Sequence, residues 1–172
     1  ADNFYRPISR KYDKAEHAYP KELDMLASLL DGMNEGSSEA TGATSASKRP
    51  SRDGDTGVRN SGNLSAALGA MELCRGDVGL LLSIPRQGIG NAAIGAVAND
   101  EQLARFKGKW AAMAITEPSC GSDSAAIRTT AVKDGDDYIL NGEKIYVTAG
   151  ARAECVVVWA TLDKSLGKAA IK

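Results

Sequence analysis

Apolar residues near the N-terminus follow the period of an α-helix. Within residues 21–33 the large apolar side chains recur every three or four positions, so they share one helix face: Leu23, Leu26, Leu30 and Met33. Pro20 suits the first turn of such a helix, where a missing N–H costs no hydrogen bond. The pattern predicts an amphipathic helix over residues 21–33.

A second apolar stretch, residues 63–98, predicts further helices. One is expected over NLSAALGAMELC (63–74) and another beginning in DVGLLLSI (77–84), after which Pro85 interrupts the pattern and GIGNAAIGAVA (88–98) resumes it. Each glycine weakens a helix by about 1 kcal/mol relative to alanine. The three glycines of the last stretch therefore indicate close contact between helices rather than helix propensity.

A short helix is expected from Asp100 to Lys107. Asn99 stands at its N-cap position and Gln102 follows three residues later, which is the spacing of a capping box. Between the two helical regions, residues 34–62 contain no large apolar residue before Val58. Such a segment buries too little surface to offset the entropy of ordering it. We expect a mobile loop there, most clearly at 36–57.

After Trp110 the pattern changes to that of β-strands. MAIT (113–116) is short and apolar, IRTTAVK (127–133) alternates, and CVVVWATL (155–162) predicts a buried strand. In DDYILNGEKIYVT, residues 136–148, Asn141 and Gly142 can take the positive φ values of a type I′ turn, which predicts a hairpin about that pair. Helices followed by antiparallel strands give an α+β class. The expected domains are a helical one at 1–110 and a β-domain beginning at 111–172.

Composition narrows the possible functions. The formal net charge is -1, with 43% hydrophobic and 25% charged residues, so we expect no nucleic-acid partner. The apolar runs are too short for a membrane span. Cys74, Cys120 and Cys155 lie far apart without a metal-binding spacing, which favours reduced thiols, no metal site and a cytoplasmic protein (or mitochondrial matrix, in a eukaryote).

Two segments carry candidate chemistry. AITEPSCGSDSA, residues 114–125, follows a short strand and can present main-chain N–H groups and hydroxyls to a phosphate, although most Gly/Ser turns are only turns. In 138–150, Tyr146 and Thr148 lie two apart, so on one strand they face the same way and suit a flat heteroaromatic ligand. The alternative is a plain hairpin whose alternate residues fill a core. GIGNAAIG (88–95) lacks the preceding strand of a dinucleotide-binding fingerprint.

Other reactive residues give weaker hypotheses. His17 is the only histidine and favours a surface position over a catalytic triad. Cys120 could be a nucleophile, but with no neighbouring base it is better explained as a small packed residue. Glu117 and Asp123 could form a carboxylate pair, or Asp123 could cap a turn.

Taken together, the two segments resemble the acyl-CoA dehydrogenase family. The pattern A-x-T-E-P-x-x-G-S-D stands here as AITEPSCGSD (114–123), and Y-x-L-N-G-x-K-x-x-x-T stands as YILNGEKIYVT (138–148). The resemblance implies an N-terminal helical domain, a middle β-barrel-like domain and a C-terminal helical bundle. It also implies FAD as cofactor, subunits in dimers or tetramers, and an electron-transferring flavoprotein as partner. The activity implied is α,β-dehydrogenation of an acyl-CoA thioester to a trans-2-enoyl-CoA, a step of lipid metabolism.

The resemblance also assigns site residues. Met113 to Ser122 would line the flavin, with Ile115 and Thr116 at the pyrimidine edge of the ring. Gly121 and Ser122 would reach the pyrophosphate, and Ser122 would also bind the CoA portion of the substrate. The Thr148 hydroxyl would lie near flavin N5. The full set of implied cofactor-binding residues is Met113, Ala114, Ile115, Thr116, Gly121, Ser122, Tyr146, Val147 and Thr148.

Some features depart from the family pattern. Many relatives have Trp where Tyr146 stands and Ala or Gly where Cys120 stands. The chain ends at Lys172 within the expected β-domain, so we expect the C-terminal bundle and its base to be absent, no catalytic residue within these 172 residues, and no activity of this chain alone. Alternatives are an acyl-CoA oxidase or related flavoprotein of the same fold, and a non-catalytic flavin-binding or scaffold subunit.

Overall fold

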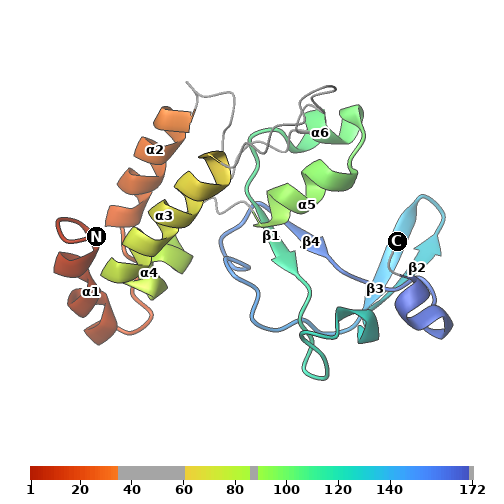
Figure 1. The fold of residues 1–172 in the computed structure, drawn as a ribbon. Coiled ribbons are helices and arrows are strands. Elements are labelled where there is room, and N and C mark those ends of the chain that lie inside the picture. The colour runs from red at the N-terminus through yellow and green to blue at the C-terminus, as the bar shows by residue number, and fades with distance from the viewer. Residues whose placement is uncertain (35–60, 86–88, 171–172) are drawn as a thin grey trace. The chain divides into compact units, whose positions relative to one another are not determined.

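The computed structural model describes residues 1–34, 61–85 and 89–170, and the chain divides into two units, Ala1–Trp110 and Ala111–Lys172 (Figure 1). The class of the described residues is α+β, as expected. The first unit contains α1 (Tyr5–Lys14), α2 (Glu22–Asn34), α3 (Ser61–Gly76), α4 (Val78–Ser83), α5 (Ile89–Val97) and α6 (Asp100–Phe106). The second contains β1 (Ala111–Ala114), β2 (Thr130–Asp134), β3 (Asp137–Asn141) and β4 (Cys155–Val158), with short 3-10 segments at Ser124–Ala126 and Lys164–Ala170.

The loop predicted at 34–62, including its mobile part at 36–57, falls almost entirely outside the described residues. Its two ends are helical instead, because α2 continues to Asn34 and α3 begins at Ser61. Among the helices in the described ranges, none combines the length and apolar character needed to cross a bilayer.

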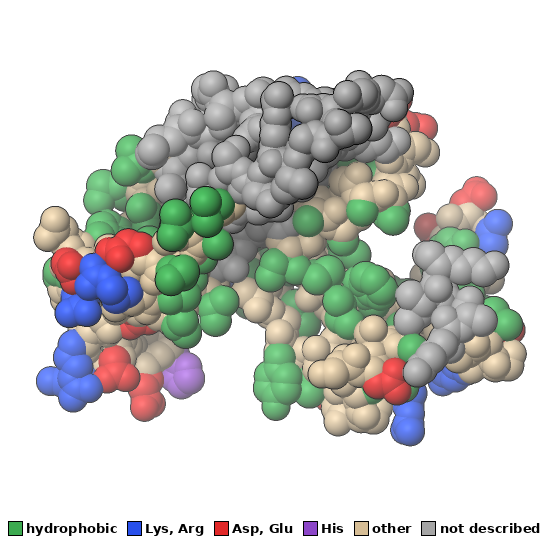
Figure 2. Space-filling model, viewed as in Figure 1, with side chains coloured by type: hydrophobic (Ala, Val, Ile, Leu, Met, Phe, Trp, Pro, Cys, Tyr) green, Lys and Arg blue, Asp and Glu red, His purple; other side chains and the backbone are tan. Residues whose placement is uncertain are grey.

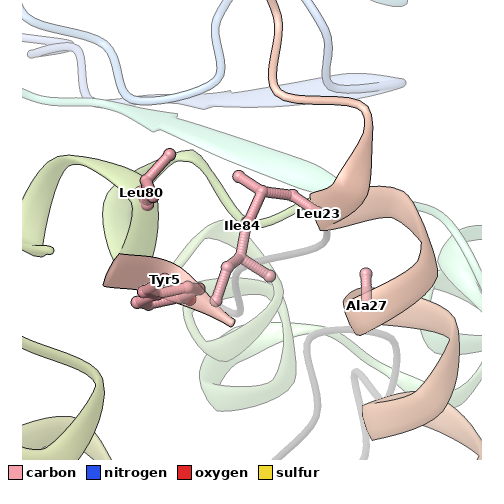
Figure 3. Close-up of a cluster of buried hydrophobic side chains, with 5 residues drawn as sticks. All are labelled: Tyr5, Leu23, Ala27, Leu80 and Ile84. Atoms are coloured by element: carbon pink, nitrogen blue, oxygen red, sulfur yellow. The ribbon is translucent and has the colours of Figure 1, made fainter. Parts of the chain in front are cut away.

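A small apolar core holds the first helices together (Figure 3). Tyr5 of α1, Leu23 and Ala27 of α2, Leu80 of α4 and Ile84 just after it are all buried. Leu23 and Leu26 confirm the predicted apolar face of α2, since Leu23 is fully buried and Leu26 packs against the cluster. Helix α1 has a mostly polar sequence, and Tyr5 is its buried residue. The packing of Tyr5, rather than a period of apolar residues, therefore accounts for this helix.

Side-chain caps fix two of the helix starts. The predicted capping box at α6 is confirmed: Gln102 N–H donates to Asn99 Oδ1 at 2.8 Å, and Asn99 N–H donates to Gln102 Oε1 at 3.0 Å. At α4 the Asp77 carboxylate accepts from Leu80 N–H at 2.9 Å, and its other oxygen accepts from the Ser9 hydroxyl of α1. The second cap therefore also joins two helices.

Contrary to the prediction from the sequence pattern, the sheets are not wholly antiparallel. β1 pairs with β4 in parallel, and β2 pairs with β3 antiparallel, so each sheet has two strands and the described residues form no closed barrel. Beyond β4 the chain continues to pair: Trp159 N–H donates to Ala114 O at 3.0 Å, and Thr161 N–H donates to Thr129 O at 2.8 Å. Residues 159–161 thus connect the end of β1 to the start of β2.

The predicted hairpin about Asn141 and Gly142 is wrong. The hairpin is β2–β3, closed by Gly135 and Asp136 between the paired residues Asp134 and Asp137, and Gly135 has the positive φ of 60° that a tight turn requires. Residues 143–148 form no strand, because Tyr146 has a φ of 56°, outside the β region.

The strand predicted to be buried at 155–162 is only partly so. In β4 the side chains alternate, with Cys155 and Val157 half-buried and Val156 and Val158 exposed. Large apolar side chains are also exposed on the helices, and Figure 2 shows hydrophobic atoms on the surface of the first unit, where α1–α4 lie. On α3 they stand at helical spacing: Leu64, Leu68 and Met71.

We predict that Gly142→Ala destabilises the protein by about 1–3 kcal/mol, the usual cost of overpacking. A Cβ at Gly142 would lie 2.6 Å from the Cα of Thr129. Thr129 is held in place because its N–H donates to the Glu117 carboxylate and its carbonyl accepts from Thr161 N–H. Urea unfolding followed by circular dichroism measures the effect. Gly69→Ala in α3 is the matched control, since a Cβ there meets nothing within 4 Å and should stabilise by about 0.5–1 kcal/mol. A wild-type midpoint for Gly142→Ala would contradict the packing argument.

Candidate functional site

The two glycine-containing segments singled out in the sequence lie side by side in the second unit. The first motif, residues 114–123, begins at the last residue of β1. The second motif, residues 138–148, contains most of β3 and the chain that follows it. The main-chain N–H of Ile145 donates to the carbonyl of Thr116 at 2.9 Å. This bond places the first segment directly against the second.

A tight turn follows Thr116 and brings the glycine back toward it. Glu117 N–H donates to Cys120 O at 2.9 Å, and Cys120 N–H donates to Glu117 O at 3.2 Å. Gly121 comes next, and a Cβ at that position would lie 3.7 Å from the Thr116 methyl group. The turn therefore sets Thr116 beside an exposed glycine, with the exposed Ser122 adjoining it.

The carboxylate of Glu117 is buried at the base of this turn, with only 4% of the side chain exposed. Its Oε1 accepts from Lys144 Nζ at 2.8 Å and from Thr129 N–H at 2.9 Å. Its Oε2 accepts from Arg128 N–H at 2.7 Å, and the Cys120 thiol lies 3.8 Å away. A buried charge needs such partners, because a carboxylate without them pays most of its desolvation cost uncompensated.

These contacts decide the ionisation of Glu117. Burial by itself raises the pKa of the carboxyl, but the hydrogen bonds from Lys144, Thr129 and Arg128 outweigh burial and lower the pKa from 4.5 to about 2. The folded-state pKa is below the unfolded value, so the charge stabilises the fold above pH 4.5, and this contribution is lost as the pH falls toward 2. The carboxylate stays charged and fully engaged near neutrality.

Lys144 is the cation of this pair and is itself 10% exposed. Its ammonium also donates to the main-chain carbonyl of Ile115 at 2.9 Å. One side chain of the second segment therefore binds two residues of the first. The carboxylate pair considered for Glu117 and Asp123 is replaced by this ion pair, and the side chain of Asp123 makes no cap bond to the 3-10 segment that it precedes.

The residues expected to bind a cofactor are distributed over both segments. Met113 and Ala114 end β1, where Ala114 is buried and Met113 half-buried. Ile115, Thr116 and Gly121 come together around the turn, as described. Tyr146, whose side chain is 87% exposed, and the exposed Thr148 follow Ile145.

The expectation that Tyr146 and Thr148 share one strand face is wrong, because this stretch is a loop. Tyr146 has a positive φ, and the carbonyl of Val147 accepts from Gly150 N–H at 3.0 Å within a turn. Conversely, the sequence did not assign a role to Lys144, although it lies within the second motif. The available indication was that Lys144 is the only basic residue in the two motifs, while the first motif carries the acidic Glu117.

Comparison with known proteins agrees with the motifs. Residues 112–171 match the family model described as acyl-CoA dehydrogenase, middle domain. The 3-(aryl)acrylate reductase of Clostridium sporogenes is 30% identical over 175 residues, covering 97% of this chain and 42% of the relative. Cyclohex-1-ene-1-carbonyl-CoA dehydrogenase of Syntrophus aciditrophicus is 45% identical over 71 residues, covering 40% of this chain and 17% of the relative.

The fold of this chain is also similar to that of a solved structure. Butyryl-CoA dehydrogenase from Megasphaera elsdenii superimposes with a TM-score of 0.67 at 28% identity, covering 96% of this chain and 42% of that protein. The chain spans less than half the length of each of these three proteins. The middle-domain match, the curated relatives and the solved structures all indicate the acyl-CoA dehydrogenase family, to whose middle domain residues 112–171 are similar.

Proposed function

We propose that this chain supplies part of the FAD and substrate site of an enzyme that converts an acyl-CoA thioester to a trans-2-enoyl-CoA. The observation that carries the proposal is the junction of the two motifs, in which Ile145 binds Thr116 and Lys144 binds Ile115 and Glu117. Residues assigned to the flavin by resemblance belong to both of the segments joined there. The match of residues 112–171 to the acyl-CoA dehydrogenase middle domain supports the same conclusion.

The chemistry of the exposed groups fits a flavin nucleotide. Tyr146 presents an exposed aromatic ring, which suits stacking on a flat heteroaromatic system. Ser122 and Thr148 are exposed hydroxyl residues, and Gly121 allows a ligand to approach the main chain. FAD, when bound, supplies the acceptor for the hydride that leaves the β-carbon of the acyl group.

Each residue has a proposed task. Ile115 and Thr116 hold the pyrimidine edge of the ring through main chain and hydroxyl, supported by Met113 and Ala114 at the end of β1. Gly121 and Ser122 hold the pyrophosphate, and Ser122 also contacts the CoA portion of the substrate. Tyr146, Val147 and Thr148 cover the remaining part of the ring. Donors held in place before the reaction stabilise charge that arrives on the ring.

Glu117 is not suited to removing the substrate α-proton. A general base works best with a pKa near the operating pH, whereas the pKa of Glu117 is about 2 and its oxygens already accept three hydrogen bonds from nitrogen donors. We therefore assign no catalytic base among the described residues. The resemblance implies that the base lies on a later helix of the whole enzyme. It also implies that an electron-transferring flavoprotein accepts the electrons and that the enzyme is a homo-oligomer.

A second candidate is reduction of an acrylate double bond. The relative that aligns with 97% of this chain is a 3-(aryl)acrylate reductase, and the same site would then act on the carbon–carbon double bond in the opposite direction. An acyl-CoA oxidase is a further alternative, in which oxygen reoxidises the flavin. A scaffold subunit that keeps the fold without chemistry is disfavoured by the retained Ser122 and Thr148.

The test uses the natural full-length protein that carries this sequence. We predict that it purifies with FAD and that acyl-CoA thioesters bleach its flavin absorbance under anaerobic conditions. Faster reoxidation by an arylacrylate than by an electron-transferring flavoprotein would favour the reductase, and rapid reoxidation by oxygen would favour the oxidase. A colourless protein with no affinity for added FAD would overturn the proposal.

We further predict that Thr148→Val slows flavin reduction in that protein about tenfold. By the resemblance, the Thr148 hydroxyl would bond to flavin N5. Losing one such bond would remove about 0.5–1.5 kcal/mol of stabilisation, and each 1.4 kcal/mol is a factor of ten in rate. Stopped-flow reduction measures the rate. Thr130→Val is the matched control, because it makes the same change in β2. There the Thr130 hydroxyl donates to Asn141 O at 3.4 Å. Equal rates for wild type and Thr148→Val at full FAD occupancy would remove the role assigned to Thr148.

A further inference from the structure

Three consecutive residues of the first motif are each held by one bond from two consecutive residues of the second. Lys144 Nζ donates to Ile115 O at 2.9 Å, Ile145 N–H donates to Thr116 O at 2.9 Å, and Lys144 Nζ donates to Glu117 Oε1 at 2.8 Å. Two of these three bonds come from one nearly buried ammonium group. Lys144 therefore fixes the orientation of the main chain at Ile115.

The anchor on the other side of this arrangement is Glu117. Its carboxylate neutralises Lys144 and also accepts from the main-chain N–H groups of Arg128 and Thr129, just before β2. A surface ion pair moves freely and contributes little. This pair is held by main chain at one end and bonds main chain at the other, so it sets one position for the ammonium.

The geometry of a peptide group extends the effect to the next residue. A peptide unit is planar, and in its trans form the C=O and the following N–H point in opposite directions; the described residues contain no cis peptide bond. With Ile115 O directed at Lys144, the N–H of Thr116 is directed away from Lys144. A positive charge at the carbonyl also polarises the peptide and strengthens the N–H as a donor.

We propose that Lys144, held by Glu117, is a positioning residue that orients and polarises the Ile115–Thr116 peptide toward the flavin ring. The inference rests on the proposed function, in which Ile115 and Thr116 meet the pyrimidine edge of the ring. Negative charge on the reduced ring is stabilised by a stronger donor, so Lys144 favours reduced over oxidised FAD. A purely structural role for the ion pair would affect stability without changing the properties of the flavin.

The experiment compares flavin midpoint potentials in the full-length, FAD-loaded protein. The informative variant combines Lys144→Met with Glu117→Gln, because it removes both buried charges and leaves neither unpaired. We expect it to fold and bind FAD, with the preference for reduced over oxidised FAD weakened about tenfold, the value of one hydrogen bond. That factor corresponds to a potential about 30 mV more negative for a two-electron couple. A shifted visible absorption spectrum should accompany it.

The matched control is Lys11→Met combined with Glu22→Gln. It removes another Lys–Glu pair, also 2.8 Å apart, that joins α1 to the start of α2 in the first unit. The control should keep the wild-type potential and spectrum. A folded Lys144/Glu117 double variant with wild-type potential, spectrum and FAD affinity would overturn the positioning role and leave the proposed function standing.

A second variant covers the case in which the double variant does not fold. Lys144→Arg keeps the positive charge but replaces a compact ammonium by a planar guanidinium, which cannot reproduce the same pair of bonds. We expect a smaller shift of potential in the same direction, and an unchanged potential in folded Lys144→Arg would overturn the proposal. Failure of the unaltered protein to bind FAD would instead overturn the proposed function, and this inference with it.

Discussion

The organisation of the second unit depends on how the buried charge of Glu117 is satisfied. A carboxylate this far from water is stable only where several donors converge on it, and here they come from the loop after β3 and from the segment before β2. The same donors fix the path of three stretches of chain. This one carboxylate therefore connects the turn at Glu117–Cys120, the start of β2 and the approach of Ile145 to Thr116.

The local features of the fold were predictable from the sequence because they depend on residues close together in the chain. The capping box of Asn99 and Gln102 requires only two side chains three residues apart. The apolar face of α2 and the separate helices α3, α4 and α5 follow from periodicity and from Pro85 as a break. Helix α1 did not follow, because its stability comes from Tyr5 packing against α2 and α4.

The non-local features were not predictable in the same way. Both Gly135–Asp136 and Asn141–Gly142 are plausible tight turns from the sequence. In the structure the first closes the hairpin, and Gly142 instead packs against Thr129, a contact that no local pattern contains. The parallel pairing of β1 with β4 likewise joins residues about forty positions apart. For the candidate site, the sequence identified both segments, but the positive φ of Tyr146 and the bond from Lys144 to Ile115 appear only in three dimensions.

The ion pair also restricts how this chain can change during evolution. Replacing either Glu117 or Lys144 alone leaves the other as an uncompensated buried charge, and removing one partner of such a pair commonly costs about 3–5 kcal/mol, which is a large part of the stability of most domains. Replacing both together leaves no unpaired charge, and the remaining requirement is an acceptor for the main-chain N–H groups of Arg128 and Thr129. The two positions, 27 residues apart, are therefore expected to be inherited as a unit, and a lineage that loses the pair should pass through a compensating change elsewhere first.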